Sequence, residues 1–530
     1  MTKFSIVIPT RNRAHTLLYT LKTCINQQDF DDYEIVVSDN CSDDNTADVV
    51  KELNSDKIKY FRTETSLAMT DSWNFAISKA KGEYVMFVGS DDAVYSYALY
   101  TLNQIASVTG EKIICYSPDK YHWPDYVDPQ EKNTFIAGGL SREPIILKVI
   151  DAKSRVRDVL DYKQPVYALP YLYTNGVVHR EIIDTLKSKT GFVFDSLGPD
   201  TYFGFAVSAL VKSYIAVSLP VNLYGMSGRS NYASYIYKVP KSESDDFFAL
   251  NELAERKASA KFYENGIPSY NDLIIQNDFT AAKRNLNAFD DIDINCTKHI
   301  KAVINERYDF YKFKGTEGKI AFNEELKLIE KIINDDETLL SSFDGVGLDI
   351  EKYTFMSPEY TAAPRVAGRW LALDLSPMKI ENISEAVTFA EKLLYPKKRV
   401  DFFLKTLKED WEKVDCLLKK LRQYERIGIF ATGGHTDALI KSYKHHGLDT
   451  AKICLFDNDE AKWGTICHGM EVLPPYLIPE QNLDALIISS YNFQDEIYDD
   501  LQQCSNDTEI IRLYGENGEN LPKEHFNWFA

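Results

Sequence analysis

The first 110 residues alternate short apolar runs with segments of helical periodicity, and this alternation is the strongest constraint on the fold. Apolar or β-branched runs cover residues 4–9, 33–38, 58–62 and 84–88. Helical spacing of apolar side chains covers residues 16–26, 46–53 and 70–81. Strands separated by helices of this length predict right-handed βαβ units and a parallel sheet.

Polar side chains follow three of these predicted strands. They are Thr10, Arg11, Asn12, Asp39, Asp91 and Asp92. By themselves, two adjacent aspartates are more typical of a solvated turn. Ligands of parallel sheets, however, bind beyond the carboxyl ends of the strands, where all three groups fall. A divalent cation is the usual reason to hold two carboxylates together, so the convergence favours a metal site.

The rest of the chain divides into two further regions. Residues 236–424 are poor in glycine and rich in amphipathic segments, with one helical stripe over 401–423, which predicts a mainly helical middle region. The alternation of strand and helix restarts at Arg426, so residues 425–530 are predicted to form a small doubly wound, Rossmann-like domain. The predicted fold class is therefore α/β, with the first domain over residues 1–235.

Composition excludes several classes of protein. The net charge of -19 and the pI near 5.0 argue against a nucleic-acid partner, which needs a basic face. Apolar runs are too short for a membrane span, and the N-terminus lacks the layout of a signal peptide. The 8 cysteines form no CxxC pair, as expected of reduced thiols in a cytoplasmic protein.

Four stretches resemble the motifs of family 2 glycosyltransferases with the GT-A fold. They are FSIVIPTRNR (4–13), YEIVVSDNCSDDNT (33–46), SWNFAISKAKGEYVMFVGSDD (72–92) and GFVFDSLGPDTYFGF (191–205). Their order and spacing match the family over residues 4 to about 230, somewhat under half of the chain. The resemblance implies a GT-A nucleotide-diphospho-sugar transferase domain, with a UDP-sugar as the expected donor.

The resemblance also implies roles for the nucleotide-binding residues. Pro9, Thr10, Arg11 and Asn12 would lie along the nucleotide. Asp39 would hold the nucleobase or the ribose.

Further roles concern the reacting groups. Asp91 and Asp92 match the last two acids of a DxD-type motif, so they would bind the donor and Mg²⁺ or Mn²⁺, with Asp92 as the direct metal ligand. Asp200 would be the general base, although it could also cap a helix. Asp195 would line the acceptor site. The family mostly inverts, so one carboxylate base suffices.

This sequence departs from the family pattern at four places. Gly89 stands where the first acid of the DxDD pattern is expected, and Pro199 replaces the Glu before the catalytic Asp. Trp73 replaces the Arg of an Arg-Asn pair and is assigned to the acceptor site, whereas Asn74 is kept and assigned to the donor. No histidine occurs over residues 222–234, where many relatives supply a third metal ligand.

The C-terminal region carries a second, weaker nucleotide signal. Gly433 and Gly434 permit a close approach of the backbone, and the following helix N-terminus suits an anion. His435 and Asp457 complete the candidate site, with Asp457 in the position of a ribose ligand. The pattern is not a full GxGxxG, so a purely structural domain explains it equally well.

These observations predict a cytoplasmic glycosyltransferase that extends a glycan or lipid-linked acceptor of a bacterial surface polysaccharide such as a capsule. A place at the inner face of the membrane stays open. The basic and aromatic segment 395–408 could contact an anionic membrane surface, although a solvated helix start explains it too. Two alternatives stay open: a sugar-modifying or second transferase activity in the C-terminal domain, and a non-catalytic scaffold. Homo-oligomerisation is also left open.

Overall fold

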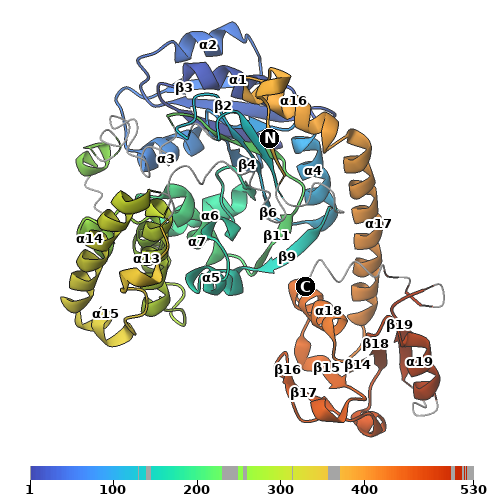
Figure 1. Cartoon of the computed structure of the whole chain (residues 1–530). Helices are drawn as coiled ribbons and strands as arrows, with labels where there is room; N and C mark the ends of the chain where they lie inside the picture. Colours follow the sequence, from blue (N-terminus) through green and yellow to red (C-terminus); the bar gives the residue numbers. More distant parts are fainter. Residues whose placement is uncertain are drawn as a thin grey trace.

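The computed structural model describes residues 2–128, 131–138, 145–229, 247, 249–254, 260–312, 314–355, 371–502, 508–515, 518–519 and 521. Figure 1 shows an N-terminal α/β domain, a group of helices beside it, and a C-terminal α/β domain at the end of one long helix.

The apolar runs near the N-terminus form one half of an eight-stranded sheet. In order across the sheet the strands are β3 (Ile58–Arg62), β2 (Tyr33–Asp39), β1 (Phe4–Thr10), β4 (Tyr84–Phe87), β10 (Gly176–His179), β6 (Ile113–Tyr116), β11 (Ser213–Val217) and β9 (Leu147–Asp151). Strands β1 to β4 pair in parallel, which confirms the predicted βαβ units. Strand β10 runs antiparallel to both β4 and β6, so the whole sheet is mixed.

Helices cover both faces of this sheet, which explains why its central strands are apolar on both sides. Successive side chains of a strand point to opposite faces. Ile6 and Ile8 accordingly belong to the core on the side of Leu17, whereas Val7 belongs to the core on the side of Ala76. The helices in this part of the chain are α1 (Ala14–Ile25), α2 (Thr46–Glu52), α3 (Met69–Lys79) and α4 (Ala98–Thr109).

A second sheet of five strands lies next to the carboxyl end of β4. Its order is β13 (Leu371–Asp374), β8 (Thr134–Ala137), β7 (Asp119–His122), β12 (Asn222–Met226) and β5 (Ala93–Val94). Strand β5 follows Asp92 directly and pairs with β12. This pairing brings residues near position 225 against the two predicted metal ligands.

The described part of the middle region is largely helical between residues 260 and 355, as predicted. Its helices are α10 (Lys261–Glu264), α11 (Tyr270–Asp272), the π-helix η2 (Leu273–Phe279), α12 (Thr280–Leu286), α13 (Cys296–Tyr311), α14 (Gly315–Asn334) and α15 (Glu337–Ser342). The last three surround their own core around Phe322. By contrast, Phe279 belongs to the core of the N-terminal domain, beside α5 (Ala152–Leu160), α6 (Arg180–Thr190) and α7 (Pro199–Ser208).

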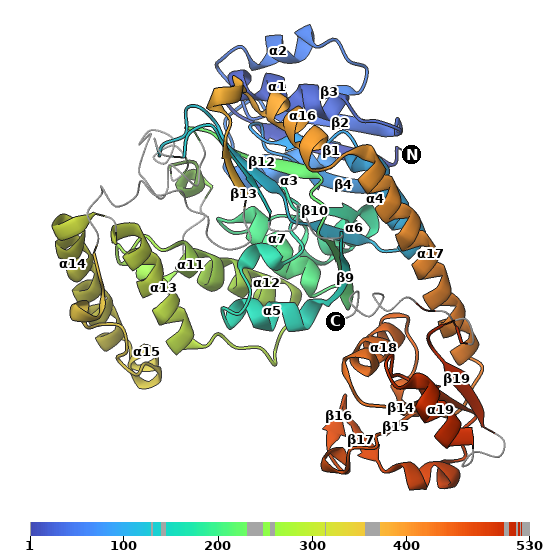
Figure 2. The same cartoon turned by 45° about the vertical axis from the view of Figure 1, so that its right-hand side comes forward.

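The end of the middle region returns to the N-terminal domain. Strand β13 pairs with β8, and α16 (Ile383–Leu393) lies along the outside of that domain (Figure 2). The Tyr395 hydroxyl donates to the buried carboxylate of Asp119 over 3.2 Å. Helix α17 (Lys397–Leu421) then carries its apolar stripe from the first domain to the last. Residues 371–421 are therefore attached to the N-terminal domain and do not form part of a separate helical unit.

The C-terminal domain contains a six-stranded sheet. Its order is β16 (Ile466–Cys467), β17 (Met470–Leu473), β15 (Ile453–Phe456), β14 (Ile427–Phe430), β18 (Ala485–Ile488) and β19 (Glu509–Arg512). All pairs are parallel except β16 with β17. The strand order reverses at β14, as in doubly wound sheets. Helices α18 (Gly434–His445) and α19 (Gln494–Gln502) are its longest.

Side chains of α18 connect the last domain to the first. His445 lies 2.7 Å from the carboxylate of Glu111, and its other ring nitrogen is 2.8 Å from the Ser213 hydroxyl. Among the helices of the described residues, we find none with the length and apolar character to cross a membrane.

Candidate active site

Asp92 is the most enclosed of the predicted site residues. Its side chain is fully buried directly before β5. One carboxylate oxygen accepts from the Gly89 amide over 2.6 Å, and the other accepts from the Gly225 amide over 2.8 Å. The Tyr173 hydroxyl contributes a further hydrogen bond. Burial, reinforced by the charge of Asp91, raises the pKa of Asp92 well above its usual range.

Asp91 lies beside Asp92 in a different environment. Its Oδ2 accepts from the Ser227 hydroxyl over 2.6 Å and lies 3.8 Å from the Arg13 guanidinium. For its Oδ1 the described residues provide no hydrogen-bond donor. Asp91 therefore keeps a carboxylate oxygen available for a ligand, whereas both oxygens of Asp92 are used by the protein.

The structure gives a steric reason for glycine at position 89. A Cβ there would lie 2.5 Å from the Tyr173 hydroxyl and 2.6 Å from Oδ2 of Asp92. The tyrosine hydroxyl thus stands where the side chain of an acid at position 89 would begin. The missing first acid and the presence of Tyr173 are two aspects of one local arrangement.

Three of the predicted acids affect the Tyr173 hydroxyl. Burial and then the charges of Asp92, Asp91 and Asp200 raise the pKa of its hydroxyl well above the usual value. Asp200 lies near the start of α7, far from the other two in the sequence. The charges of the predicted metal pair and of the predicted base therefore all act on this one hydroxyl.

Asp200 is half-buried, and its Oδ1 accepts from the Thr201 amide over 3.0 Å. Burial raises the pKa of Asp200. A raised pKa brings a carboxylate closer to the range in which it works as a general base near neutral pH.

The loop that carries Asp200 is held by an acid from the middle region. Asp278, on the π-helix η2, is buried, accepts from the Ser196 hydroxyl over 2.6 Å and contacts the Thr201 hydroxyl. Burial and the charge of Asp200 raise the pKa of Asp278 well above its usual range. Asn285 of α12 makes a second link by donating to Asp195 over 2.8 Å.

Asn74 and Trp73 support this loop in the structure. The Asn74 amide donates to the Phe194 carbonyl over 2.8 Å and accepts from the Val193 amide over 3.0 Å. Trp73 is 6% exposed, and its ring packs against the rings of Tyr173 and Phe194. Both side chains thus brace the segment before Asp195, and their predicted contacts with donor and acceptor stay untested.

The predicted nucleotide residues lie in two loops that interlock. The carbonyl of Thr10 accepts from the Asn40 amide over 2.9 Å, and Oδ1 of Asn12 accepts from the Asp43 amide over 2.7 Å. Pro9 and Arg11 flank Thr10 at the end of β1. These contacts place the two loops side by side at the carboxyl edge of the sheet.

The Asp39 carboxylate is fully buried at the end of β2. It accepts from the Ser42 amide over 2.9 Å and from the Tyr60 hydroxyl over 2.5 Å, and it pairs with Arg62 over 3.2 Å. Asp39 thus holds its own loop in shape, and a direct contact with nucleobase or ribose stays a prediction.

In the C-terminal domain, Asp457 binds groups of its own domain. Its Oδ2 accepts from the Thr432 amide over 2.7 Å and from Lys462 over 2.9 Å. Burial alone would raise its pKa, but hydrogen bonds from Thr432 and Lys462 outweigh burial and lower the pKa to about 2. A Cβ added to Gly433 or Gly434 would meet nothing within 4 Å, so the turn borders open space. His435 lies 2.8 Å from the Tyr514 hydroxyl.

Four residues around the site were not singled out from the sequence: Arg13, Tyr173, Ser227 and Asp278. Arg13 stands inside the first motif, directly after Asn12, so its position was a usable signal. Tyr173 and Asp278 lie outside the four motifs, and Ser227 lies in the stretch 222–234, where the family pattern points to a histidine. Their roles follow from contacts between distant parts of the chain.

Comparisons with known proteins identify relatives of this chain. A family model described as glycosyl transferase family 2 matches residues 5–164. The poly(ribitol-phosphate) beta-N-acetylglucosaminyltransferase TarP of Staphylococcus aureus is 32% identical over 271 residues, which cover 50% of this chain and 75% of that protein. A GalNAc(5)-diNAcBac-PP-undecaprenol beta-1,3-glucosyltransferase of Campylobacter jejuni is 41% identical over 110 residues, 20% of this chain and 35% of that protein. The match thus spans about a third of this second relative.

Two further similarities concern the structure and the C-terminal domain. The crystal structure of S. aureus TarS 1–349 in complex with UDP-GlcNAc aligns with 66% of this chain and 89% of that chain, at 17% identity and a TM-score of 0.36. A family model described as C2185-like, N-terminal, matches residues 423–511.

Proposed function

Because the chain belongs to glycosyltransferase family 2, we propose that it transfers a sugar from a nucleotide-sugar donor to a glycan or lipid-linked acceptor during synthesis of a bacterial surface polysaccharide. The observation that supports this most directly is that the charges of Asp91, Asp92 and Asp200 all act on the buried Tyr173 hydroxyl. Such transfer needs a group that receives the leaving diphosphate and a carboxylate that takes a proton, and this site contains candidates for both.

The reaction is a single displacement at the anomeric carbon. The acceptor hydroxyl oxygen attacks this carbon while the bond to the diphosphate breaks, and the electron pair of that bond leaves with the diphosphate. Asp200 takes the proton of the hydroxyl. Its pKa, raised by burial, favours the proton transfer near neutral pH. Direct attack inverts the anomeric configuration.

Asp91 would hold a divalent cation that accompanies the diphosphate. The side chain fits a divalent cation, because Oδ1 has no donor among the described residues and one carboxylate with phosphate oxygens is a common environment for Mg²⁺. When bound, Mg²⁺ or Mn²⁺ stabilises the negative charge of the leaving diphosphate. Asp92 has both oxygens committed to the protein, so we assign it to holding the loop and assign the direct contact to Asp91.

Arg13 adds a fixed positive charge on the same side. Its guanidinium lies 3.8 Å from Asp91, and its side chain is 11% exposed. Its Nη1 and Nη2 already donate to the Ser227 hydroxyl and the Arg229 carbonyl, so what it offers to phosphate oxygens is its permanent positive charge. We therefore assign Arg13 to the donor diphosphate, beside Asp91.

The helical middle region positions the base. Asp278 binds both ends of the turn from Ser196 to Thr201, and Asn285 binds Asp195 from α12. Since Asp200 lies inside this turn, movement of η2 would displace the base from the acceptor. Misplacement of a reacting group by about 1 Å can cost about 100-fold in rate.

The acceptor is proposed from the relatives, whose names specify poly(ribitol-phosphate) and undecaprenyl-linked glycans. A lipid-linked acceptor would place the protein at the inner face of the membrane. Two side chains of α17 suit such a peripheral contact. Phe402 is 71% exposed, and Lys398 is exposed one turn before it.

The decisive experiment combines donor binding with transfer. UDP-, GDP-, CMP- and dTDP-sugars are compared by thermal shift with and without Mn²⁺, because a ligand of the native state raises its apparent stability. The preferred donor, expected to be a UDP-sugar, is then used in transfer assays with Asp91→Asn and Asp200→Asn. Full transfer activity in both variants would contradict the proposed site and favour a scaffold.

A second candidate function belongs to the C-terminal domain. The open space around Gly433 and Gly434, at the N-terminus of α18, favours a nucleotide or sugar-nucleotide site. Its test uses the full chain with Asp91→Asn to weaken the first site. A nucleotide that still binds, and that is lost on Gly434→Trp, would support a second site, whereas loss of all binding on Asp91→Asn would contradict it.

A further inference from the structure

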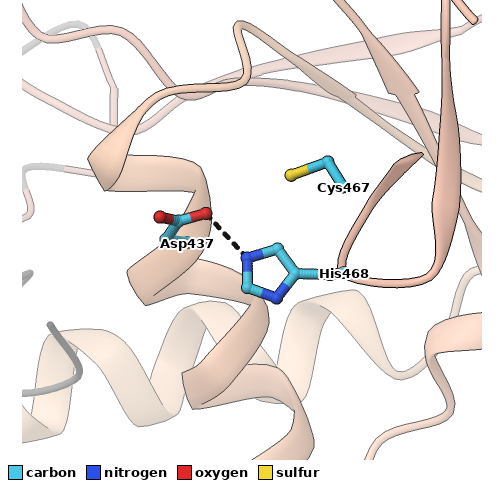
Figure 3. A group of neighbouring side chains, drawn as sticks. All are labelled: Asp437, Cys467 and His468. Carbon is cyan, nitrogen blue, oxygen red and sulfur yellow. Dashed lines mark hydrogen bonds and ion pairs between the residues drawn. The ribbon is translucent and has the colours of Figure 1, made fainter. Parts of the chain in front are cut away.

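Three side chains of different chemistry meet on the surface of the C-terminal domain (Figure 3). Asp437, Cys467 and His468 each offer one ligand atom, and these atoms all lie within 4.8 Å of one another. No other group of three such residues occurs in the ranges that the structure describes. The glycosyl transfer proposed above makes no use of this cluster.

Two elements of the fold supply the three residues. Asp437 stands in the first turn of α18. Cys467 ends β16, and His468 with Gly469 forms the two-residue connection to β17, since Cys467 pairs with Met470. Both connecting residues have positive φ, 52° for His468 and 83° for Gly469, as in a type I′ turn. Asparagine, aspartate or glycine usually occupies the first position of this turn, so a histidine there is unusual.

The turn points the His468 ring at α18. Its Nε2 lies 2.7 Å from Oδ1 of Asp437, and the sulfur of Cys467 lies above the same gap. The side chains of His468 and Asp437 are 19% and 48% exposed, so an ion from solvent can reach the group. The position is therefore fixed on one side by a tight turn and open on the other.

We propose that Asp437, Cys467 and His468 bind a divalent cation of the zinc type. Sulfur, imidazole nitrogen and carboxylate oxygen are the three ligand types of zinc in proteins. Thiolate and carboxylate together carry two negative charges, which balance a divalent ion. The positive charge of the neighbouring Lys462 is offset in part by its ion pair with Asp457 over 2.9 Å.

Binding requires a small adjustment of the pair formed by His468 and Asp437. Tetrahedral zinc with ordinary bond lengths separates its nitrogen and oxygen ligands by about 3.4 Å. The present 2.7 Å separation of Nε2 and Oδ1 is a hydrogen bond, which the ion would replace. The exposed Asp437 can move by this amount through its side-chain torsions alone.

Three protein ligands leave a fourth position for water or a ligand, as in catalytic zinc sites. Asp437 lies one helical turn after Gly434. The cation would therefore stand close to the N-terminus of α18, where the second candidate site is placed. The metal inference does not depend on nucleotide binding there, and it is independent of the proposed glycosyl transfer.

The test uses Co²⁺ in place of zinc on the full chain after treatment with a chelator. A bound thiolate gives a charge-transfer absorption in the near ultraviolet that the oxygen ligands at Asp91 cannot give. We expect one equivalent of Co²⁺ to produce this band, and one equivalent of Zn²⁺ to remove it. Cys467→Ser should abolish the band, and His468→Ala should weaken binding at least tenfold.

Matched variants separate this site from others in the chain. Cys416→Ser removes an exposed cysteine on α17 and should leave the band unchanged. Asp91→Asn should leave it unchanged as well. Absence of the band at stoichiometric Co²⁺, its persistence in Cys467→Ser, or an equal loss in Cys416→Ser would each overturn the proposal. Circular dichroism of Cys467→Ser checks that the variant folds, and Asp437→Asn provides a second route to the same result.

Discussion

The N-terminal and the C-terminal sheet both place acidic side chains after parallel strands, yet the surroundings of these acids differ. Asp92, between β4 and β5, is fully buried and contacts Gly225 of the second sheet and Tyr173. Asp457 in the last sheet binds Thr432 and Lys462 of its own domain. Sheet topology thus brings acids to the same edge in both domains, and the added layers of the first domain turn that edge into an enclosed site.

The largest expected effect concerns the base. Asp200→Asn should lower kcat by about 10²–10⁴-fold with little change in donor KM, because it removes general-base catalysis. Asp457→Asn, the matched change in the other domain, should leave transfer unchanged. Steady-state kinetics with both variants measures this, and equal losses would contradict the assignment of the chemistry to the first domain.

The pH dependence of kcat in the wild type is a second test of the role of Asp200. Burial raises the pKa of Asp200, so its carboxylate is lost at a higher pH than that of an ordinary aspartate, about 3.9. The value of kcat should therefore fall as the pH decreases through this raised pKa, and the acidic limb should be absent in Asp200→Asn. An acidic limb that the variant retains would assign it to another group.

The next effect is that of the metal-facing acid. Asp91→Asn should lower kcat/KM by about 10²–10³-fold, since it weakens stabilisation of the leaving diphosphate. It should also abolish the stabilisation that Mn²⁺ adds to the donor complex in thermal shift. Asp92→Asn should chiefly reduce folding stability, because both of its oxygens accept hydrogen bonds from the protein. If Asp92→Asn abolished the effect of Mn²⁺ and Asp91→Asn did not, Asp92 would be the direct metal ligand.

Asp278 is expected to act by holding the turn that carries Asp200 in position. Its raised pKa favours a protonated carboxyl, whose hydrogen bonds an amide can reproduce. Asp278→Ala should lower kcat roughly tenfold or more through misplacement of Asp200, whereas Asp278→Asn should restore most of the activity. Equal activity of the alanine variant and the wild type would remove the middle region from the mechanism.

The raised pKa of Asp278 also predicts how the folding stability depends on pH. Because its pKa is higher in the folded chain than in the unfolded one, the folded state holds this proton more tightly. Its contribution to stability is present at low pH and is lost as the pH rises through the raised pKa. Urea unfolding at several pH values should show this decrease in the wild type and a smaller one in Asp278→Asn.

The smallest expected effects are changes in folding stability when Gly225 or Gly434 is replaced by alanine. A Cβ at Gly225 would lie 1.7 Å from the Asp91 carbonyl oxygen, so Gly225→Ala should cost roughly 1–3 kcal/mol of unfolding free energy by overpacking. Gly434→Ala meets nothing within 4 Å and should change stability by less than about 0.5 kcal/mol. Chemical denaturation distinguishes them, and similar values would contradict the difference in enclosure between the two strand ends.

Much of the secondary structure of the first domain can be predicted from the local pattern of apolar residues. Strands β1 to β4 and the helices between them follow from apolar periodicity over fewer than 100 residues, because each βαβ unit is formed by neighbours in the sequence. Asp39, Asp91 and Asp92 follow from the same pattern, since they stand at strand ends, whereas Asp195 and Asp200 follow only from the family resemblance.

The tertiary contacts of the middle region could not be predicted from the sequence, because an apolar stripe does not show which element a helix packs against. The apolar stripes of α14 and α17 look alike in the sequence. Yet α14 belongs to a separate helical core, whereas α17 contacts both α/β domains. The return of β13 to β8 joins residues more than 230 positions apart. No local rule predicts such a pair.

The sequence by itself determined the parallel strands, the acids at their ends and, through its motifs, the glycosyltransferase family. Tertiary structure alone decided which of the two adjacent aspartates keeps an available oxygen. It also decided that Tyr173 occupies the space beside Gly89, that Asp278 supports the loop of the base, and that Cys467 and His468 meet Asp437. The physical reason is range: periodicity and turn chemistry act over a few residues, whereas hydrogen bonding and burial of a carboxylate depend on whatever the whole fold places beside it.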